Sequence, residues 1–110
     1  MAVQVNINQV IHEIIRRLTE ELAPQKIILF GSYAKGQAHE DSDIDLLIIA
    51  DMPEPFFKRL TRVRKAVSGT HPGIPIDPIV LTPLELEARL RKGDQFIAEV
   101  MEEGQAIYVA

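Results

Sequence analysis

The sequence predicts an α/β fold in which a small mixed β-sheet is flanked by helices. Apolar residues at helical spacing alternate along the chain with short isoleucine-rich runs, and glycines and prolines mark the boundaries between them. This alternation is typical of helices packed on a sheet. A chain of 110 residues is long enough for one core, so we expect residues 1–110 to form a single domain.

The composition disfavours several classes of protein. The chain is 46% hydrophobic and 25% charged, as in globular domains, and it contains no cysteine for disulfides or thiolate metal sites. Its net charge of −4 disfavours direct binding to nucleic acid, which requires a basic surface. The first residues, MAVQVNINQV, lack the features of a secretory signal, and no apolar run approaches the ~20 residues of a membrane span. We therefore expect a cytoplasmic protein without membrane contact.

The first element is an amphipathic helix. Apolar residues recur at spacings of three and four from Ile7 to Leu22. Asn6 or Asn8 can cap its start, and Pro24 ends it.

Three short segments have the character of strands. Residues 26–30 (KIILF) form a buried strand that ends at a glycine, and a short helix or turn then continues to Gly36. Residues 43–50 (DIDLLIIA) and 76–81 (IDPIVL) each combine an acidic start with an apolar body. Because Pro78 cannot donate a backbone hydrogen bond, the last of these should lie at or near an edge of the sheet.

A second helix begins at Phe56 and ends near Gly69. Its residues 58–65 contain five basic side chains and no acid, which indicates either a solvated face or a contact with RNA or a partner. The basic residues are spread around the helix, which argues against a single binding stripe.

The end of the chain contains two further helices and a short strand. Thr82 and Glu85 have the spacing of a capping box, with proline between them, and the helix they begin should end at Gly93. Asp94 can cap the last helix, and residues 106–109 can form a final strand. The side chains expected to face inward from the last helix are Phe96, Ile97, Val100 and Met101.

Three aspartates are candidate metal ligands and catalytic residues. Asp43 and Asp45 are two residues apart on a strand, so their side chains share one face at roughly 7 Å spacing. No lysine or arginine lies within five residues of this pair, so its repulsion needs another cation. Oxygen ligands without histidine or cysteine suit Mg²⁺ or Mn²⁺. If Asp77 lies on a neighbouring strand, three carboxylates converge.

The segment that follows the first strand is a candidate phosphate site. Gly31 allows the backbone to approach a phosphate closely, the following turn offers N–H groups, and Ser32 adds a hydroxyl donor. Lys35 can reach the phosphates. The segment is not a Walker loop, because Gln37 stands where that loop requires lysine.

The segment LFGSYAKGQAHEDSDIDLLII resembles the signature of the nucleotidyltransferase superfamily typified by DNA polymerase β. Gly-Ser is followed after ten residues by Asp43-Ile44-Asp45, and Asp77 matches the third acid of the pattern. The resemblance implies the palm-like fold of that superfamily, with a nucleoside triphosphate and Mg²⁺ held by these residues. The short chain is similar to the minimal nucleotidyltransferases of bacteria and archaea.

Such minimal domains often pair with a small helical HEPN protein in a toxin–antitoxin module. The resemblance therefore implies an antitoxin that transfers AMP from ATP to a tyrosine hydroxyl of the toxin. Larger relatives carry a second domain that positions the acceptor, and here we expect a partner to supply that surface. A homodimer is also compatible with the sequence.

Two alternatives stay open. A non-catalytic module of the same fold would neutralise its partner by contact, through exposed apolar residues of the helices at 83–103. An enzyme working alone on RNA ends or a small alcohol is the other alternative, although the acidic balance disfavours it.

Overall fold

A computed structural model describes residues 6–110, so the prediction about a secretory signal lies partly outside the described residues. The first helix, α1 (Ile7–Leu22), begins at Asn6, whose side chain accepts hydrogen bonds from the backbone N–H groups of Asn8 and Gln9. This confirms the first of the two predicted caps. The helix ends at Ala23, which adopts a left-handed conformation with φ of 45° just before the proline.

The four strands form one mixed sheet with the order β3-β2-β1-β4. β1 pairs antiparallel with β2 and β4, whereas β2 and β3 are parallel. The predicted edge position of Pro78 is confirmed, since β3 is the outer strand beside β2. The strands are β1 (Lys26–Phe30), β2 (Ile44–Ile49), β3 (Ile76–Leu81) and β4 (Gln105–Val109).

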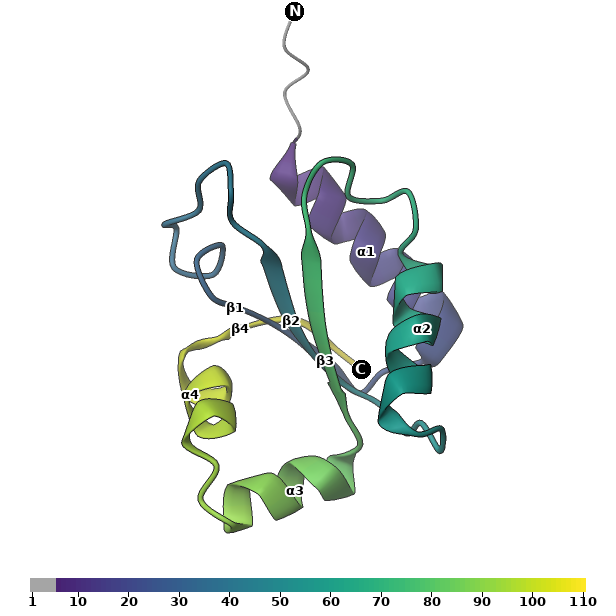
Figure 1. Cartoon of the computed structure of the whole chain (residues 1–110), viewed down its shortest axis with the longest axis vertical. Helices are drawn as coiled ribbons and strands as arrows, with labels where there is room; N and C mark the ends of the chain where they lie inside the picture. The colour runs from purple at the N-terminus through teal and green to yellow at the C-terminus, as the bar shows by residue number, and fades with distance from the viewer. Residues whose placement is uncertain (1–5) are drawn as a thin grey trace, which may run out of the picture.

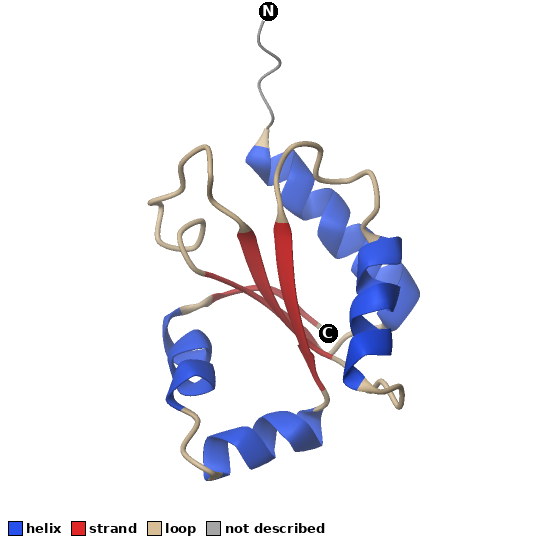
Figure 2. Ribbon diagram, in the orientation of Figure 1, coloured by secondary structure: helices blue, strands red, loops and turns tan. Residues whose placement is uncertain are grey.

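Three further helices are α2 (Phe56–Ala66), α3 (Pro83–Arg91) and α4 (Gln95–Glu103). The predicted capping box of α3 is confirmed, because Thr82 and Glu85 exchange hydrogen bonds between side chain and backbone. The Asp94 side chain accepts from the N–H of Ile97 and so caps α4 as predicted. Figures 1 and 2 show α1 and α2 together on one side of the sheet and α3 and α4 on the other.

Strand alternation divides the buried residues between the two faces. Side chains such as Ile27 and Leu46 pack with α1 and α2 into the larger core. Ile28 and Leu47, one residue further along, pack with Ile97 and other side chains into a smaller core. The smaller core is covered mainly by α4, and no residue of α3 is buried. The α3–α4 side of the sheet therefore has the thinner cover.

The basic stretch on α2 is not simply a solvated face. Arg59 is buried, and its guanidinium donates to the Glu54 carbonyl at 2.7 Å and to the Glu85 carboxylate at 2.5 Å. Arg62 donates to the Glu54 carboxylate at 2.7 Å and to the Glu21 carbonyl at 2.9 Å. Two of the five basic residues thus link α2 to neighbouring segments.

None of the helices within residues 6–110 is both long and apolar enough to cross a bilayer.

Candidate active site

Asp45 and Asp77 lie side by side at one end of the sheet. They are direct partners in the parallel register of β2 and β3, so their Cα atoms are separated by one strand spacing, roughly 4.8 Å. Asp45 is half-buried and Asp77 is exposed. Because β3 is an edge strand, solvent reaches the pair from the side of Asp77, whereas β1 flanks Asp45 on the other side.

Asp43 precedes β2 and is exposed. Its position follows from a closed turn, in which the His39 N–H donates to the Ser42 hydroxyl at 2.9 Å and the Ser42 N–H donates to the His39 carbonyl at 3.0 Å. Ser42 is buried, and the Ile44 N–H bonds to the Pro75 carbonyl at 2.8 Å, which joins the start of β2 to the start of β3.

The electrostatics of the site centre on Asp45. Burial raises the pKa of its carboxyl above the ordinary value, and the charges of Asp77 and Asp43 raise it further. Asp43 and Asp77 therefore both lie close enough to Asp45 to repel its charge. Within residues 6–110, however, no three acidic or histidine side chains are already arranged to hold a metal ion by themselves. A cation here would need ligands from a bound molecule as well.

Gly31 is required by its conformation and by its neighbour. Its φ is +75°, in the region that favours glycine, and a Cβ built on it would lie 2.2 Å from Oδ2 of Asp45. The antiparallel register pairs Phe30 with Asp45, which brings the end of β1 against the acidic pair. The backbone at Gly31 is thus in direct contact with the carboxylate that the sequence singled out.

A hydrogen-bonded turn follows Gly31, rather than a helix. The Lys35 N–H donates to the Gly31 carbonyl at 3.2 Å and the Gln37 N–H to the Ser32 carbonyl at 2.9 Å, so the N–H groups of residues 32–34 are not used within the turn. The Gln105 side chain donates to the Ala34 carbonyl at 2.7 Å and ties the turn to β4. Free amides at such a turn suit an anion.

The predicted phosphate-binding residues thus lie at the same end of β1 as Asp45. Ser32 is half-buried, and Lys35 is exposed. Tyr33, which follows Ser32 and could either stack on a base or cover the turn, packs against the larger core. That contact favours the covering role.

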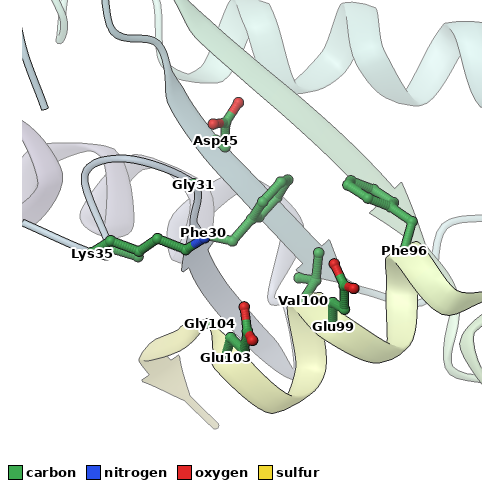
Figure 3. A pocket seen from close by; sticks show the side chains of 10 residues that line it. Phe30, Gly31, Lys35, Asp45, Phe96, Glu99, Val100, Glu103 and Gly104 are labelled. Atoms are coloured by element: carbon green, nitrogen blue, oxygen red, sulfur yellow. The ribbon is translucent and has the colours of Figure 1, made fainter. Parts of the chain in front are cut away.

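A cavity of about 240 Å³ adjoins these residues. Figure 3 shows Gly31, Lys35 and Asp45 on one side of it and residues of α4 on the other. The rings of Phe30 and Phe96 meet edge to face with centroids 5.8 Å apart. The prediction that Phe96 of α4 faces inward is wrong, because 52% of its surface is exposed. Its side chain lines the cavity instead.

A family model for the nucleotidyltransferase domain matches residues 11–107. The chain belongs to the nucleotidyltransferase family. The match confirms the resemblance inferred from the Gly-Ser and Asp-x-Asp segment, and it extends over nearly the whole sequence.

Two relatives of this nucleotidyltransferase come from Methanocaldococcus jannaschii. The putative protein adenylyltransferase MJ1305 is 35% identical over 88 residues, which cover 76% of this chain and 60% of the relative. The putative protein adenylyltransferase MJ0604 is 64% identical over 28 residues, which cover 26% of this chain and 28% of the relative. The matched part therefore spans less than two thirds of either relative.

Solved structures confirm the fold. A toxin–antitoxin crystal structure with AMP-PNP contains a chain that matches with a TM-score of 0.65 at 24% identity, covering 90% of this nucleotidyltransferase and 73% of that chain. A nucleotidyltransferase structure from Sulfolobus solfataricus matches with a TM-score of 0.52 at 22% identity, covering 99% and 93%. At these identities the likeness supports the mixed sheet flanked by helices, and no more.

Proposed function

We propose that this nucleotidyltransferase transfers AMP from ATP to a hydroxyl group of a partner protein. The observation that carries the proposal is the contact between the Gly31 backbone and Asp45, whose neighbour across the parallel register is Asp77. It puts a backbone suited to phosphate beside carboxylates suited to a divalent cation. The names of the two archaeal relatives, putative protein adenylyltransferases, support the choice of AMP and of a protein acceptor.

The acids fit Mg²⁺ in one particular way. Mg²⁺ is usually bound in proteins by one or two carboxylates together with substrate phosphates and water, rather than by a complete protein cage. A close carboxylate pair without a third ready ligand matches that preference. We assign Asp43, Asp45 and Asp77 as the metal-binding and catalytic residues. Once bound, the metal would offset the negative charge of the triphosphate and of the leaving pyrophosphate.

The chain's own groups would position the nucleotide and the acceptor. The amides after Gly31, the Ser32 hydroxyl and the Lys35 ammonium would donate to phosphate oxygens. The acceptor oxygen would attack the α-phosphorus and form a new P–O bond while the bond to the pyrophosphate oxygen breaks. Asp77 is exposed at the edge of the sheet, and it would take the proton of the hydroxyl.

We further propose that the partner is a HEPN-type toxin and that the acceptor is a tyrosine. Toxin–antitoxin complexes among the fold neighbours, including MntA-HpeT, in which one chain matches with a TM-score of 0.64 at 22% identity, support a toxin as the partner. The HEPN class of the partner and the tyrosine acceptor rest on the resemblance of the Gly-Ser and Asp-x-Asp segment to minimal nucleotidyltransferases. The nucleotidyltransferase would then act in the cytoplasm as the antitoxin, as a single domain of residues 1–110.

Intact-mass spectrometry tests the transfer. The chain is co-expressed with the protein encoded by its neighbouring gene, and this candidate partner should gain the mass of one or more AMP groups. Asp43→Ala/Asp45→Ala should abolish the gain, whereas Asp41→Ala, an exposed acid two residues before the pair, should keep it. Peptide mapping should place the AMP on tyrosine.

The same experiment discriminates the contact-only alternative. That alternative is favoured by the exposed apolar side chains of α3 and α4, among them Leu84, 77% exposed, and Leu90, 40% exposed. If the partner is neutralised without any gain in mass, and the double variant neutralises it equally well, contact carries the effect and the proposed transfer is wrong.

A further inference from the structure

The cavity beside Gly31 extends away from the acidic pair toward α4 (Figure 3). Its volume of about 240 Å³ is below the ~300 Å³ at which pockets begin to enclose a whole drug-sized ligand. It therefore suits one part of a nucleotide. The side chains that line the cavity determine which part of the nucleotide it can hold.

Two carboxylates of α4 line the cavity. Glu99 and Glu103 are four residues apart, so they lie one above the other on the same side of the helix. Figure 3 shows both carboxylates directed from α4 toward the space beside the Phe30 ring. None of the ion pairs found within residues 6–110 includes either of them.

An ionised carboxylate only accepts hydrogen bonds. The phosphates of a nucleotide are themselves anionic acceptors, so they would be repelled by Glu99 and Glu103. They belong instead at the opposite wall, which provides Lys35 and the turn amides. The groups of a nucleotide that can donate to carboxylates are the ribose hydroxyls and the amino group of the base. A carboxylate that binds ribose hydroxyls is a recurrent solution in dinucleotide-binding folds.

The aromatic pair completes this wall. Phe30 and Phe96 present apolar surface beside the carboxylates, with ring centroids 5.8 Å apart. Phe96 is 52% exposed, although it lies on the same helix as the fully buried Ile97. An apolar ring half-exposed next to acceptor groups suits a sugar and base, which have apolar faces and polar edges.

We propose that the cavity between the turn at 31–35 and α4 holds the nucleoside part of the triphosphate, with Glu99 and Glu103 accepting hydrogen bonds from the ribose hydroxyls. The site therefore selects ribonucleotides over deoxyribonucleotides. This inference rests on the proposed function, and it makes these two glutamates specificity-determining residues of the same site.

Isothermal titration calorimetry with the full chain and Mg²⁺ tests the inference, using ATP and 2′-deoxyATP as probes. The unmodified protein should bind ATP at least about tenfold more tightly, the factor expected from one charge-assisted hydrogen bond. Glu99→Ala/Glu103→Ala should reduce this ratio to near one. The ratio is the decisive quantity, because removing two negative charges also changes the affinity of both nucleotides.

Glu102→Ala is the matched control, since Glu102 is exposed on the same helix and does not line the cavity. It should keep the preference for ATP. Equal binding of the two nucleotides by the unmodified protein, or an unchanged ratio in the double variant, would overturn the inference and leave the proposed function intact. Absence of any nucleotide binding would overturn both. A double variant that lowers only the affinity for the partner protein would show that the cavity holds an acceptor side chain instead.

Discussion

At the scale of single residues, the site combines groups that weaken the fold when no ligand is bound. Asp45 is the clearest case, because burial and the charges of Asp77 and Asp43 all raise the pKa of its carboxyl. Such a group is stabilised by a cation and destabilised without one. The same residue should therefore have opposite effects on stability and on activity.

Replacing Asp45 with Asn should stabilise the ligand-free protein at neutral pH while abolishing transfer. The amide removes a charge that the folded state disfavours, and each kcal/mol regained raises the melting temperature of a domain this size by roughly 4–8 °C. Calorimetry measures the change. Asp41→Asn, in the exposed loop, is the control and should leave the melting temperature nearly unchanged.

The direction of the pH dependence follows from the raised pKa. Folding favours the protonated carboxyl, so the unfavourable contribution of Asp45 is absent below the ordinary value of 3.8 and develops as pH rises through the higher folded value. The advantage of the Asn variant should shrink as pH falls toward 4. An advantage that is constant with pH would contradict this explanation.

Gly31 provides a second test at this scale. An Ala at this position meets both a left-handed φ and the Asp45 carboxylate at 2.2 Å, whereas a Cβ on Gly36, with φ of +68°, meets nothing within 4 Å. Gly36→Ala should therefore cost only the conformational strain, about 1–2 kcal/mol. Gly31→Ala should cost more and also abolish transfer. Urea unfolding and transfer assays measure both variants. If Gly31→Ala and Gly36→Ala lose the same stability and the same activity, the contact between Gly31 and Asp45 has no role.

At the scale of elements, α3 is held to the rest of the protein by the packing of Leu86 against the smaller core and by polar contacts. Arg59 of α2 bonds to Glu85, which also closes the capping box of α3. The backbone N–H of Thr82 lowers the pKa of Glu85, and Arg59 lowers it further, although burial opposes both. The stability that Glu85 contributes is therefore present above its ordinary value of 4.5 and lost as pH falls through the lower folded value.

Arg59→Met should destabilise the protein by about 1–3 kcal/mol, because it removes hydrogen bonds to a carboxylate and leaves the Glu54 carbonyl without its partner. Arg91→Met breaks an exposed pair with Glu87 and should cost less than about 0.5 kcal/mol. Denaturant unfolding of both variants gives the comparison. A similar loss in both would argue against a structural role for Arg59.

The elements also show what the sequence can predict. The bounds of β1 and β3 and the caps of α1, α3 and α4 agree with the structure, because apolar runs and capping residues are local signals. The pairing of Asp45 with Asp77 is not local. The two residues are close only because β2 and β3 are neighbours in the sheet, and no local sequence signal predicts that strand order.

The cavity was missed for the same reason. Phe96 has helical spacing with buried residues and was expected in the core, and nothing near Glu99 indicates that α4 lies opposite the turn at Gly31. Arg59 likewise looked like part of an exposed basic face, because its partner Glu85 is 26 residues away in the sequence.

At the scale of the whole molecule, a domain with a net charge of −4 is proposed to bind an anionic nucleotide. Mg²⁺ should therefore be required for tight binding, because ATP alone would add negative charge beside Asp45. Saturating ATP and Mg²⁺, at about 100 times the dissociation constant, should stabilise the fold by about 2.7 kcal/mol. Thermal unfolding with ATP and a chelator should show little of this gain, and an equal gain without metal would contradict the role of the acids.

The most direct test of the account is a crystal structure with a non-hydrolysable ATP analogue and Mn²⁺, whose anomalous signal locates the metal. We expect Mn²⁺ bound by carboxylates of Asp43, Asp45 and Asp77, with phosphate oxygens against the turn that begins at Gly31. Nucleotide or metal bound elsewhere, with this end of the sheet empty, would contradict it.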